Sequence, residues 1–118
     1  MSLFDLATLT EFTGTQHYYK ISGRFVLTDG TKFLADQAHC YWLIDAVVSH
    51  LLEIGTADWF VVIKTTVANC SALMVYEDGN GNEHARQAIP YTDLPLAEVV
   101  LYGCWDGNQW VIMLPSEY

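Results

Sequence analysis

The sequence predicts one α+β domain over residues 1–118, with N-terminal helices packed on a mainly antiparallel β-sheet, a meander, in the second half. Two observations carry this fold class. A stripe of apolar residues at helical spacing runs up to Ile54, and after Gly55 apolar residues recur at every second position, which is the period of a strand. A length of 118 residues and a hydrophobic content of 52% are also typical of one domain with a core of its own.

The N-terminal quarter predicts a short helix followed by a hairpin. Ser2 can cap a helix over Leu3–Phe12, whose leucines share one face, and Gly14 can end it. Two segments rich in aromatic and β-branched residues, His17–Ile21 and Arg24–Leu27, then flank a Ser-Gly pair. This pattern is typical of a β-hairpin.

The clearest helical pattern extends from Thr31 to about Ile54. A break near His39 can split it, which would leave Thr31–Ala38 as a separate turn or short helix before the main helix over Cys40–Ile54. We expect this main helix to pack on the sheet through one continuous apolar stripe. The residues of the stripe are Leu43, Ile44, Val47, Val48 and Leu51.

Five strands are predicted after Gly55, and the short connections between them favour an antiparallel meander. Several strands are apolar on both faces, so the sheet needs a second cover besides the helices. Without it, residues such as Trp59, Phe60, Trp110 and Ile112 would form a large exposed apolar patch, and a homodimer would bury that patch. The predicted strands are Asp58–Thr66, Ser71–Glu77, His84–Ile89, Glu98–Cys104 and Gln109–Leu114.

Charge gives the strongest indication of the kind of partner. The chain has 14 acidic and 5 basic residues, a formal net charge of −9, and beyond Lys64 its only Lys or Arg is Arg86. Such a surface repels nucleic-acid phosphates and anionic lipid and attracts basic partners. The tyrosines and tryptophans could resemble a base-stacking platform, but single-strand binders combine such a platform with a basic groove, so we expect no direct nucleic-acid binding.

Location and redox state follow from simple features. The N-terminus has no basic segment typical of a secretory signal, and no apolar stretch approaches the roughly 18 residues that cross a membrane. We therefore expect a cytoplasmic protein without membrane contact. Cys40, Cys70 and Cys104 are an odd number with no C-x-x-C spacing, which predicts reduced, buried thiols instead of disulfides.

One pair of residues could support catalysis. Cys40 begins the main helix, where a thiolate is stabilised by unsatisfied N–H groups, and His84 with Asn82 or Asp93 would complete a thiol-hydrolase arrangement. However, the residues around Cys40 match no cysteine-nucleophile signature, and cysteine is among the residue types most often buried. The sequence therefore favours a structural Cys40.

No cofactor or metal site is predicted. The turn Asp78–Asn82 resembles the start of a calcium loop, but Glu83 stands where that loop needs Gly and Ile89 where it needs Glu. The four histidines are scattered along the chain without metal-ligand spacing, and the glycines form no phosphate-binding loop.

Three segments together resemble a family of small bacterial and phage or plasmid proteins known only as a domain of unknown function. They are Tyr41–Ala46, the stretch from Glu77 to Pro95, and the ending Val111–Tyr118, which closes with Leu-Pro-Ser-Glu-Tyr. The resemblance covers most of the chain from about Leu9. It implies a prokaryotic or mobile-element setting and transfers no catalytic residue.

Two function classes remain open after these exclusions. The first is a non-enzymatic accessory or regulatory binding protein whose acidic face contacts a basic protein, of a kind that holds DNA or RNA. The second is a small thiol hydrolase that uses Cys40 and His84. A scaffold whose only partner is a second copy of itself is a third possibility.

Overall fold

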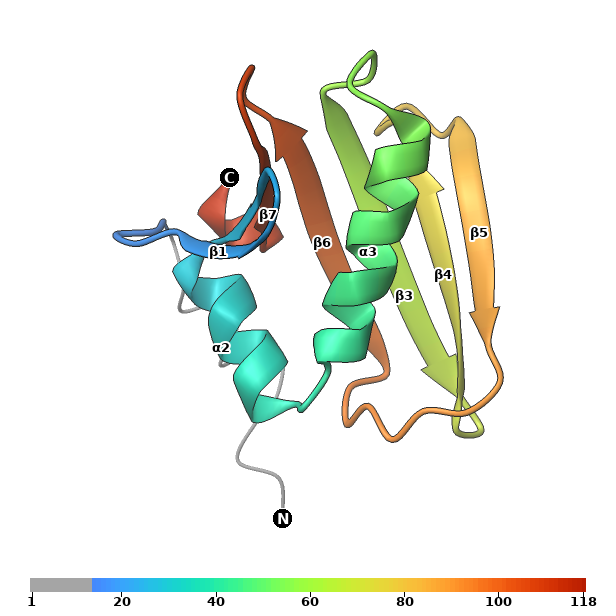
Figure 1. Ribbon diagram of the computed structural model, residues 1–118. Coiled ribbons are helices and arrows are strands. Elements are labelled where there is room, and N and C mark those ends of the chain that lie inside the picture. Colours follow the sequence, from blue (N-terminus) through green and yellow to red (C-terminus); the bar gives the residue numbers. More distant parts are fainter. Residues whose placement is uncertain (1–13) are drawn as a thin grey trace.

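The computed structural model describes residues 14–118, in which seven strands form one sheet and two α-helices lie against it (Figure 1). The order of the strands across the sheet is β1-β2-β7-β6-β3-β4-β5. The helix expected over Leu3–Phe12 falls outside the described residues. The strands are β1 (Tyr19–Ser22), β2 (Phe25–Leu27), β3 (Phe60–Ala68), β4 (Ser71–Glu77), β5 (Glu83–Ile89), β6 (Glu98–Trp105) and β7 (Trp110–Met113).

The sheet is mostly antiparallel, as predicted, but it is not a meander. Residues 90–97 carry the chain from the edge strand β5 past β4 and β3, so that β6 pairs with the other side of β3. The N-terminal hairpin β1–β2 then joins the sheet through a parallel pairing of β2 with β7. The prediction of a meander was wrong because strand spacing reports strand existence and not the order in which distant strands pair.

Two helices replace the single helical pattern of the sequence, and both follow the first hairpin. Helix α2 (Asp29–Gln37) begins after Thr28, and helix α3 (Tyr41–Ile54) ends at Gly55. The break lies where the sequence indicated it: His39 has a φ of 52°, a conformation that interrupts a helix. Gly55 ends α3 with a φ of 82° and a ψ of 179°, a positive-φ conformation that glycine adopts without the steric cost of a Cβ atom.

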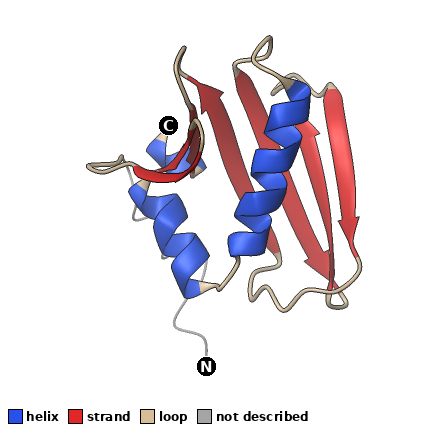
Figure 2. Ribbon diagram, in the orientation of Figure 1, coloured by secondary structure: helices blue, strands red, loops and turns tan. Residues whose placement is uncertain are grey.

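The main core lies between α3 and one face of the sheet, which we call the inner face (Figure 2). The fully buried residues Leu43, Val47 and Leu51 of α3 belong to the same apolar cluster as Ile63 of β3. A Cβ atom on Gly103 would lie 3.1 Å from Leu51 Cδ1, so the missing side chain lets the helix approach β6 closely. A large residue at position 103 would force these two elements apart.

The opposite, outer face carries a smaller aromatic cluster. Phe60, Tyr102 and Tyr118 meet edge to face, with ring centroids 5.0 to 5.7 Å apart, so the C-terminal residue lies against this face. Trp110 and Ile112, by contrast, are buried in the main core. The predicted patch of Trp59, Phe60, Trp110 and Ile112 is therefore wrong in its membership, because these residues divide between buried and partly exposed positions.

The C-terminal turn η1 (Pro115–Glu117) ties the end of the chain to the start of α2. Glu117 Oε2 accepts the backbone N–H of Gly30 at 3.0 Å, and Glu117 Oε1 accepts the Thr28 hydroxyl at 2.6 Å and the Leu114 N–H at 3.1 Å. A carboxylate at a helix N-terminus satisfies free N–H groups and opposes the helix dipole. Gly30 leaves room for this contact, since a Cβ there would come within 2.6 Å of Glu117 Oε1.

Candidate functional site

Cys40 has the surroundings of a structural thiol. It precedes the first residue of α3, is completely buried, and its sulfur donates a long hydrogen bond of 3.7 Å to the Leu34 carbonyl. Burial raises the pKa of the thiol to about 11. At neutral pH the nucleophilic thiolate is therefore a very small fraction of this cysteine.

His84 belongs to β5 and lies near the end of α3 that is opposite to Cys40. Its Nε2 is 2.5 Å from Oδ2 of Asp58, a residue that follows the end of α3. Cys40 stands at the other end of that 14-residue helix, which is about 20 Å long. The structure thus does not bring the two candidate residues together, and it pairs His84 with Asp58 instead of Asn82 or Asp93.

Two of the other histidines, His50 and His17, have partners of their own. His50 on α3 hydrogen-bonds to Oε1 of Gln87 at 2.9 Å and packs on the buried Tyr76 ring, while His17 lies 3.7 Å from Asp29. Within residues 14–118, no three His, Cys, Asp or Glu side chains are grouped closely enough to hold a metal ion. The described helices include none long and apolar enough to cross a membrane.

The turn between β4 and β5 is held by the Asp78 carboxylate. Its Oδ1 accepts the backbone N–H groups of Asn80 at 2.8 Å and Asn82 at 3.1 Å, and its Oδ2 accepts the Asn82 side-chain amide at 2.8 Å. The Asn82 amide, followed by the Asn80 N–H, lowers the pKa of Asp78, so this carboxylate keeps its charge at neutral pH. Both of its oxygens thus serve the turn.

A hollow of about 420 Å³ opens beside this turn, and we call it the acidic hollow. Trp59 forms part of its wall and is 56% exposed, an unusual degree for a tryptophan. Carboxylates flank it from two segments: Asp58 from the loop before β3, and Asp78 from the turn after β4. Its lining residues are Ala57, Asp58, Trp59, Phe60, Asp78, Gly79 and Asn80.

Each wall of the acidic hollow is fixed by contacts of its own. The Asp58 carboxylate is held between His84 and the Phe60 N–H. Gly79 lies so close to the Phe60 ring that a Cβ atom added at Gly79 would be 3.4 Å from the ring carbon Cδ2. The backbone carbonyl of Trp59 accepts the Trp105 N–H at 2.8 Å. The exposed indole and the two carboxylates are therefore presented by rigid backbone.

Comparison with known families identifies the chain. The model of a family of unknown function, DUF6876, matches residues 5–118. The chain belongs to this family. No curated protein and no solved structure matched it.

The family match confirms the resemblance to an uncharacterised small domain, and the structure gives its three segments a place. Tyr41–Ala46 forms the first turns of α3, and the segment from Glu77 to Pro95 holds the turn at the acidic hollow, β5 and part of the crossing connection. The ending Val111–Tyr118 supplies β7 and the Glu117 contact with α2. The ending thus joins elements that are distant in sequence.

Asp58 and Trp59 are the site residues that sequence reasoning missed. The alternation of apolar residues from Trp59 to Ile63 predicts a strand that begins at Asp58, whereas β3 begins at Phe60. Asp58 and Trp59 therefore lie in the loop before the strand. One feature of the sequence could have indicated this site: Asp58 and Trp59 lie between Gly55, which ends the helix, and the next strand, so the sequence places a large aromatic residue in a connection.

Alkylation of the native protein tests the structural assignment of Cys40. We expect iodoacetamide at pH 7 to label the exposed Cys70 quickly and Cys40 only after unfolding, because Cys40 is buried and protonated. Mass spectrometry of the digested protein over time distinguishes the two sites. Labelling of Cys40 at the rate of Cys70, or faster at pH 6, would contradict the assignment and restore a reactive thiol.

Proposed function

We propose that the protein is a non-enzymatic accessory binding protein of bacterial or mobile-element origin that contacts a basic protein partner. A Lys or Arg side chain of the partner occupies the acidic hollow, with its charge over the Trp59 ring. The observation that carries this proposal is the exposed indole between the carboxylates of Asp58 and Asp78. A cation over a tryptophan face gains about 0.5–1 kcal/mol at an exposed site and more when desolvated.

The distribution of charge supports a basic partner. Lys64 pairs with Glu77 at 2.9 Å and Arg86 with Glu83 at 2.6 Å, so the basic residues of β3 and β5 are already engaged by carboxylates of the sheet. Asp78 and Asp106 stay ionised, because backbone N–H groups and amides of their turns lower the pKa of both carboxyls. The turns near the acidic hollow thus keep a negative field that speeds encounter with a positive surface.

The hydrolase alternative has less support. It requires a thiolate within hydrogen-bond reach of a histidine, whereas Cys40 precedes α3 and His84, on β5, pairs with Asp58 beyond the other end of that helix. Burial also raises the pKa of the Cys40 thiol. We also retain the cytoplasmic location as part of the proposal. Its support is the odd number of cysteines without C-x-x-C spacing.

Peptide binding tests the basic-partner proposal. A fluorescein-labelled peptide of alternating Arg and Gly should bind the protein, more weakly as salt rises, as measured by fluorescence anisotropy. Trp59→Ala should weaken this binding about two- to fivefold, because the cation loses the ring face. The substitution is tolerated by the fold, since more than half of this side chain is exposed.

Asp45→Asn is the matched control for this experiment. It removes one negative charge from an exposed position of α3 and leaves the acidic hollow intact. We expect it to change binding less than Asp58→Asn does. Equal losses of affinity in the two Asp variants, together with an unchanged affinity in Trp59→Ala, would mean that the peptide binds through net charge alone. This result would refute the proposed site.

A homodimer is the second part of the proposal, and the outer face of the sheet is its basis. Val62, Val75, Val100 and Met113 line that face, and of the helices within residues 14–118 only η1 contributes contacts there, through the neighbouring Tyr118. Two such faces can bury each other across a two-fold axis. The charge of −9 opposes association, but at physiological salt the Debye length is only about 8 Å.

Light scattering on a sizing column tests the dimer. At tens of micromolar protein and moderate salt, the mass should be twice the 13.3 kDa of one chain, and the dimer should strengthen with salt as acid repulsion is screened. A mass of one chain under these conditions would refute this part of the proposal and leave the basic-partner part unaffected.

A further inference from the structure

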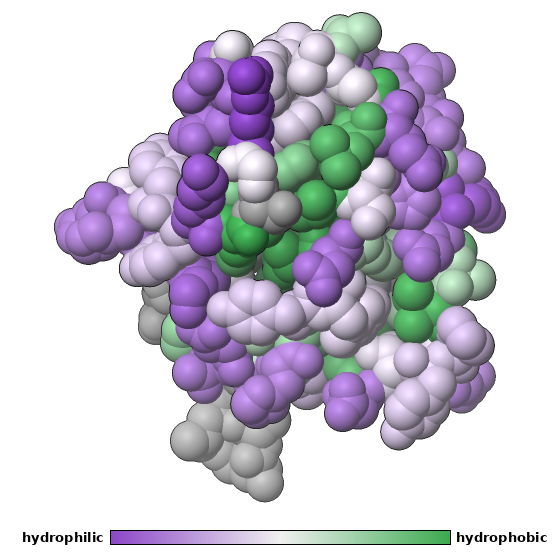
Figure 3. Space-filling view, in the orientation of Figure 1, coloured by the Kyte–Doolittle hydropathy of each residue, from purple (hydrophilic) through white to green (hydrophobic). Residues whose placement is uncertain are grey.

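A second hollow, of about 290 Å³, lies on the side of the molecule where the N-terminal hairpin faces α3, and we call it the apolar hollow. A band of apolar residues crosses this side of the molecule between hydrophilic margins (Figure 3). The apolar hollow is distinct from the acidic hollow, although the loop after α3 borders both. Gly55 and Thr56 line the apolar hollow, and residues 57–60 line the acidic hollow. The apolar walls come from Phe25, Val48, Leu51, Leu52, Trp105 and Trp110.

The walls of the apolar hollow form a surface suited to a flat or slender apolar body. The Trp105 and Trp110 rings have centroids 5.8 Å apart and are tilted by 58°, and Trp110 is almost completely buried. Leu52, on the facing helix, is 67% exposed, so it presents its side chain to solvent as an open wall. A volume near the lower end of the roughly 300–1,000 Å³ typical of ligand pockets suits a molecule smaller than a drug.

One cation, Arg24, lines the apolar hollow, and within residues 14–118 it forms no ion pair. Of the five Lys and Arg residues, Lys32, Lys64 and Arg86 each pair with a carboxylate, at 2.6, 2.9 and 2.6 Å. For Arg24 and Lys20, no carboxylate lies within ion-pair distance in the part of the chain that the structure describes, and of these two only Arg24 lines the apolar hollow. Its backbone is fixed all the same, because the Arg24 carbonyl accepts the Trp110 N–H at 2.7 Å.

A guanidinium that forms no ion pair among residues 14–118 lies on the wall of an apolar hollow, in a chain with a net charge of −9, and this combination favours an anionic ligand with an apolar body. We propose that the apolar hollow binds a small monocarboxylate, with its aromatic or short aliphatic body between Trp105 and Leu52 and its carboxylate on Arg24. Arginine binds carboxylates through two parallel hydrogen bonds. Thr56, also a lining residue, offers a hydroxyl donor.

Two electrostatic features oppose an anion at this position, and both are weaker than the attraction by Arg24. The C-terminal end of α3 borders the apolar hollow and carries about half a negative charge, which is less than the full positive charge of Arg24. The other acids of the chain act over longer distances and are screened beyond about 8 Å at physiological salt. The local contact with Arg24 therefore governs whether a carboxylate binds.

Isothermal titration calorimetry with 4-phenylbutyrate tests the proposal. The body of this probe is a phenyl ring on a short chain. We expect saturable binding with a dissociation constant on the order of 0.1–1 mM, which is the affinity typical of a ligand with about 12 non-hydrogen atoms. The matched alcohol, 4-phenylbutan-1-ol, has the same body without the charge and should bind at least about fivefold more weakly.

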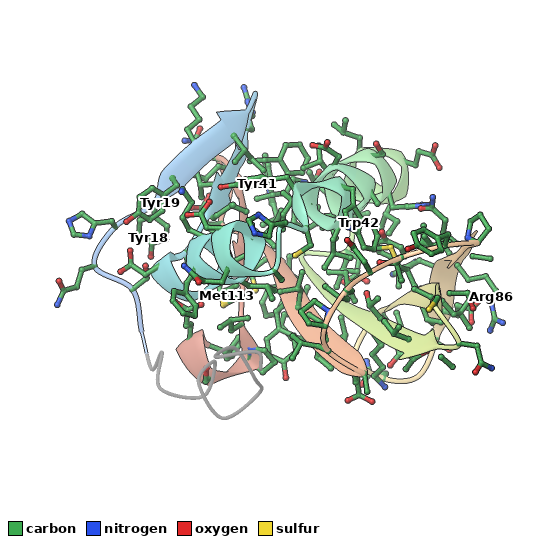
Figure 4. All side chains as sticks on the ribbon, turned by 90° about the horizontal axis from the view of Figure 1, so that it is seen from below. Tyr18, Tyr19, Tyr41, Trp42, Arg86 and Met113 are labelled. Carbon is green, nitrogen blue, oxygen red and sulfur yellow. The ribbon has the colours of Figure 1, made fainter. Side chains whose placement is uncertain are left out.

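Two variants of the same hairpin separate a direct contact from general attraction. Arg24→Gln should weaken 4-phenylbutyrate about tenfold, whereas Lys20→Gln, which removes a cation of β1 that does not line the apolar hollow, should leave it within about twofold. Arg86→Gln, at the opposite edge of the sheet (Figure 4), serves as a distant control. Leu52→Asp should abolish binding while its exposed position preserves the fold, which circular dichroism checks.

Several results would overturn the proposal. They are equal affinity for the acid and the alcohol, an unchanged affinity in Arg24→Gln, a loss in Lys20→Gln equal to that in Arg24→Gln, or no saturable heat up to 10 mM ligand, roughly ten times the weakest expected constant. If the basic-peptide assay fails while 4-phenylbutyrate binds as described, this proposal stands alone, because it does not depend on the proposed function.

Discussion

The attachment of the N-terminal hairpin and α2 to the rest of the sheet depends on one seam at the end of the chain. Three register pairs join β2 to β7 in parallel, and immediately beyond them Glu117 bonds to Thr28 and Gly30 at the start of α2. Hydrogen bonds to a charged group are each worth roughly 1.5–3 kcal/mol, and leaving the helix N–H groups without a partner has a similar cost. The last residues of the chain therefore hold its first elements in place.

This seam also builds one of the two surfaces to which we assign a proposed role, the apolar hollow. The apolar hollow takes Arg24 and Phe25 from the hairpin and Trp110 from β7, so it exists only while β2 and β7 stay paired. On the other side of the loop after α3, the acidic hollow depends on contacts between β3, the β4–β5 turn and β5, through Asp58, Asp78 and His84. A single loop, residues 55–59, thus separates an apolar site from a charged one.

The sequence predicted the local elements well and their pairing less well. The period of the apolar residues indicated both helices, the break at His39 and every strand within one to two residues of its observed ends, because these depend on neighbouring residues. The central position of β3 depends on its pairing with β6, and the parallel pairing of β2 with β7 joins residues 85 apart in the chain, from Phe25 to Trp110. One sequence carries no periodic signal for such pairings. The same limit concealed the Asp58–His84 pair and the contact of Glu117 with Gly30, because a count of charges does not say which side chains lie together.

Hydrogen–deuterium exchange on Glu117→Ala tests the seam most directly, with Glu98→Ala, an exposed acid of β6, as the control. We predict that amides of α2 and β2 exchange at least about tenfold faster in Glu117→Ala, as loss of a charge-assisted contact requires, while those of β3 and β4 keep their protection and Glu98→Ala matches the wild type. Unchanged protection of α2 and β2, or an equal loss in β4, would contradict the central place of this seam.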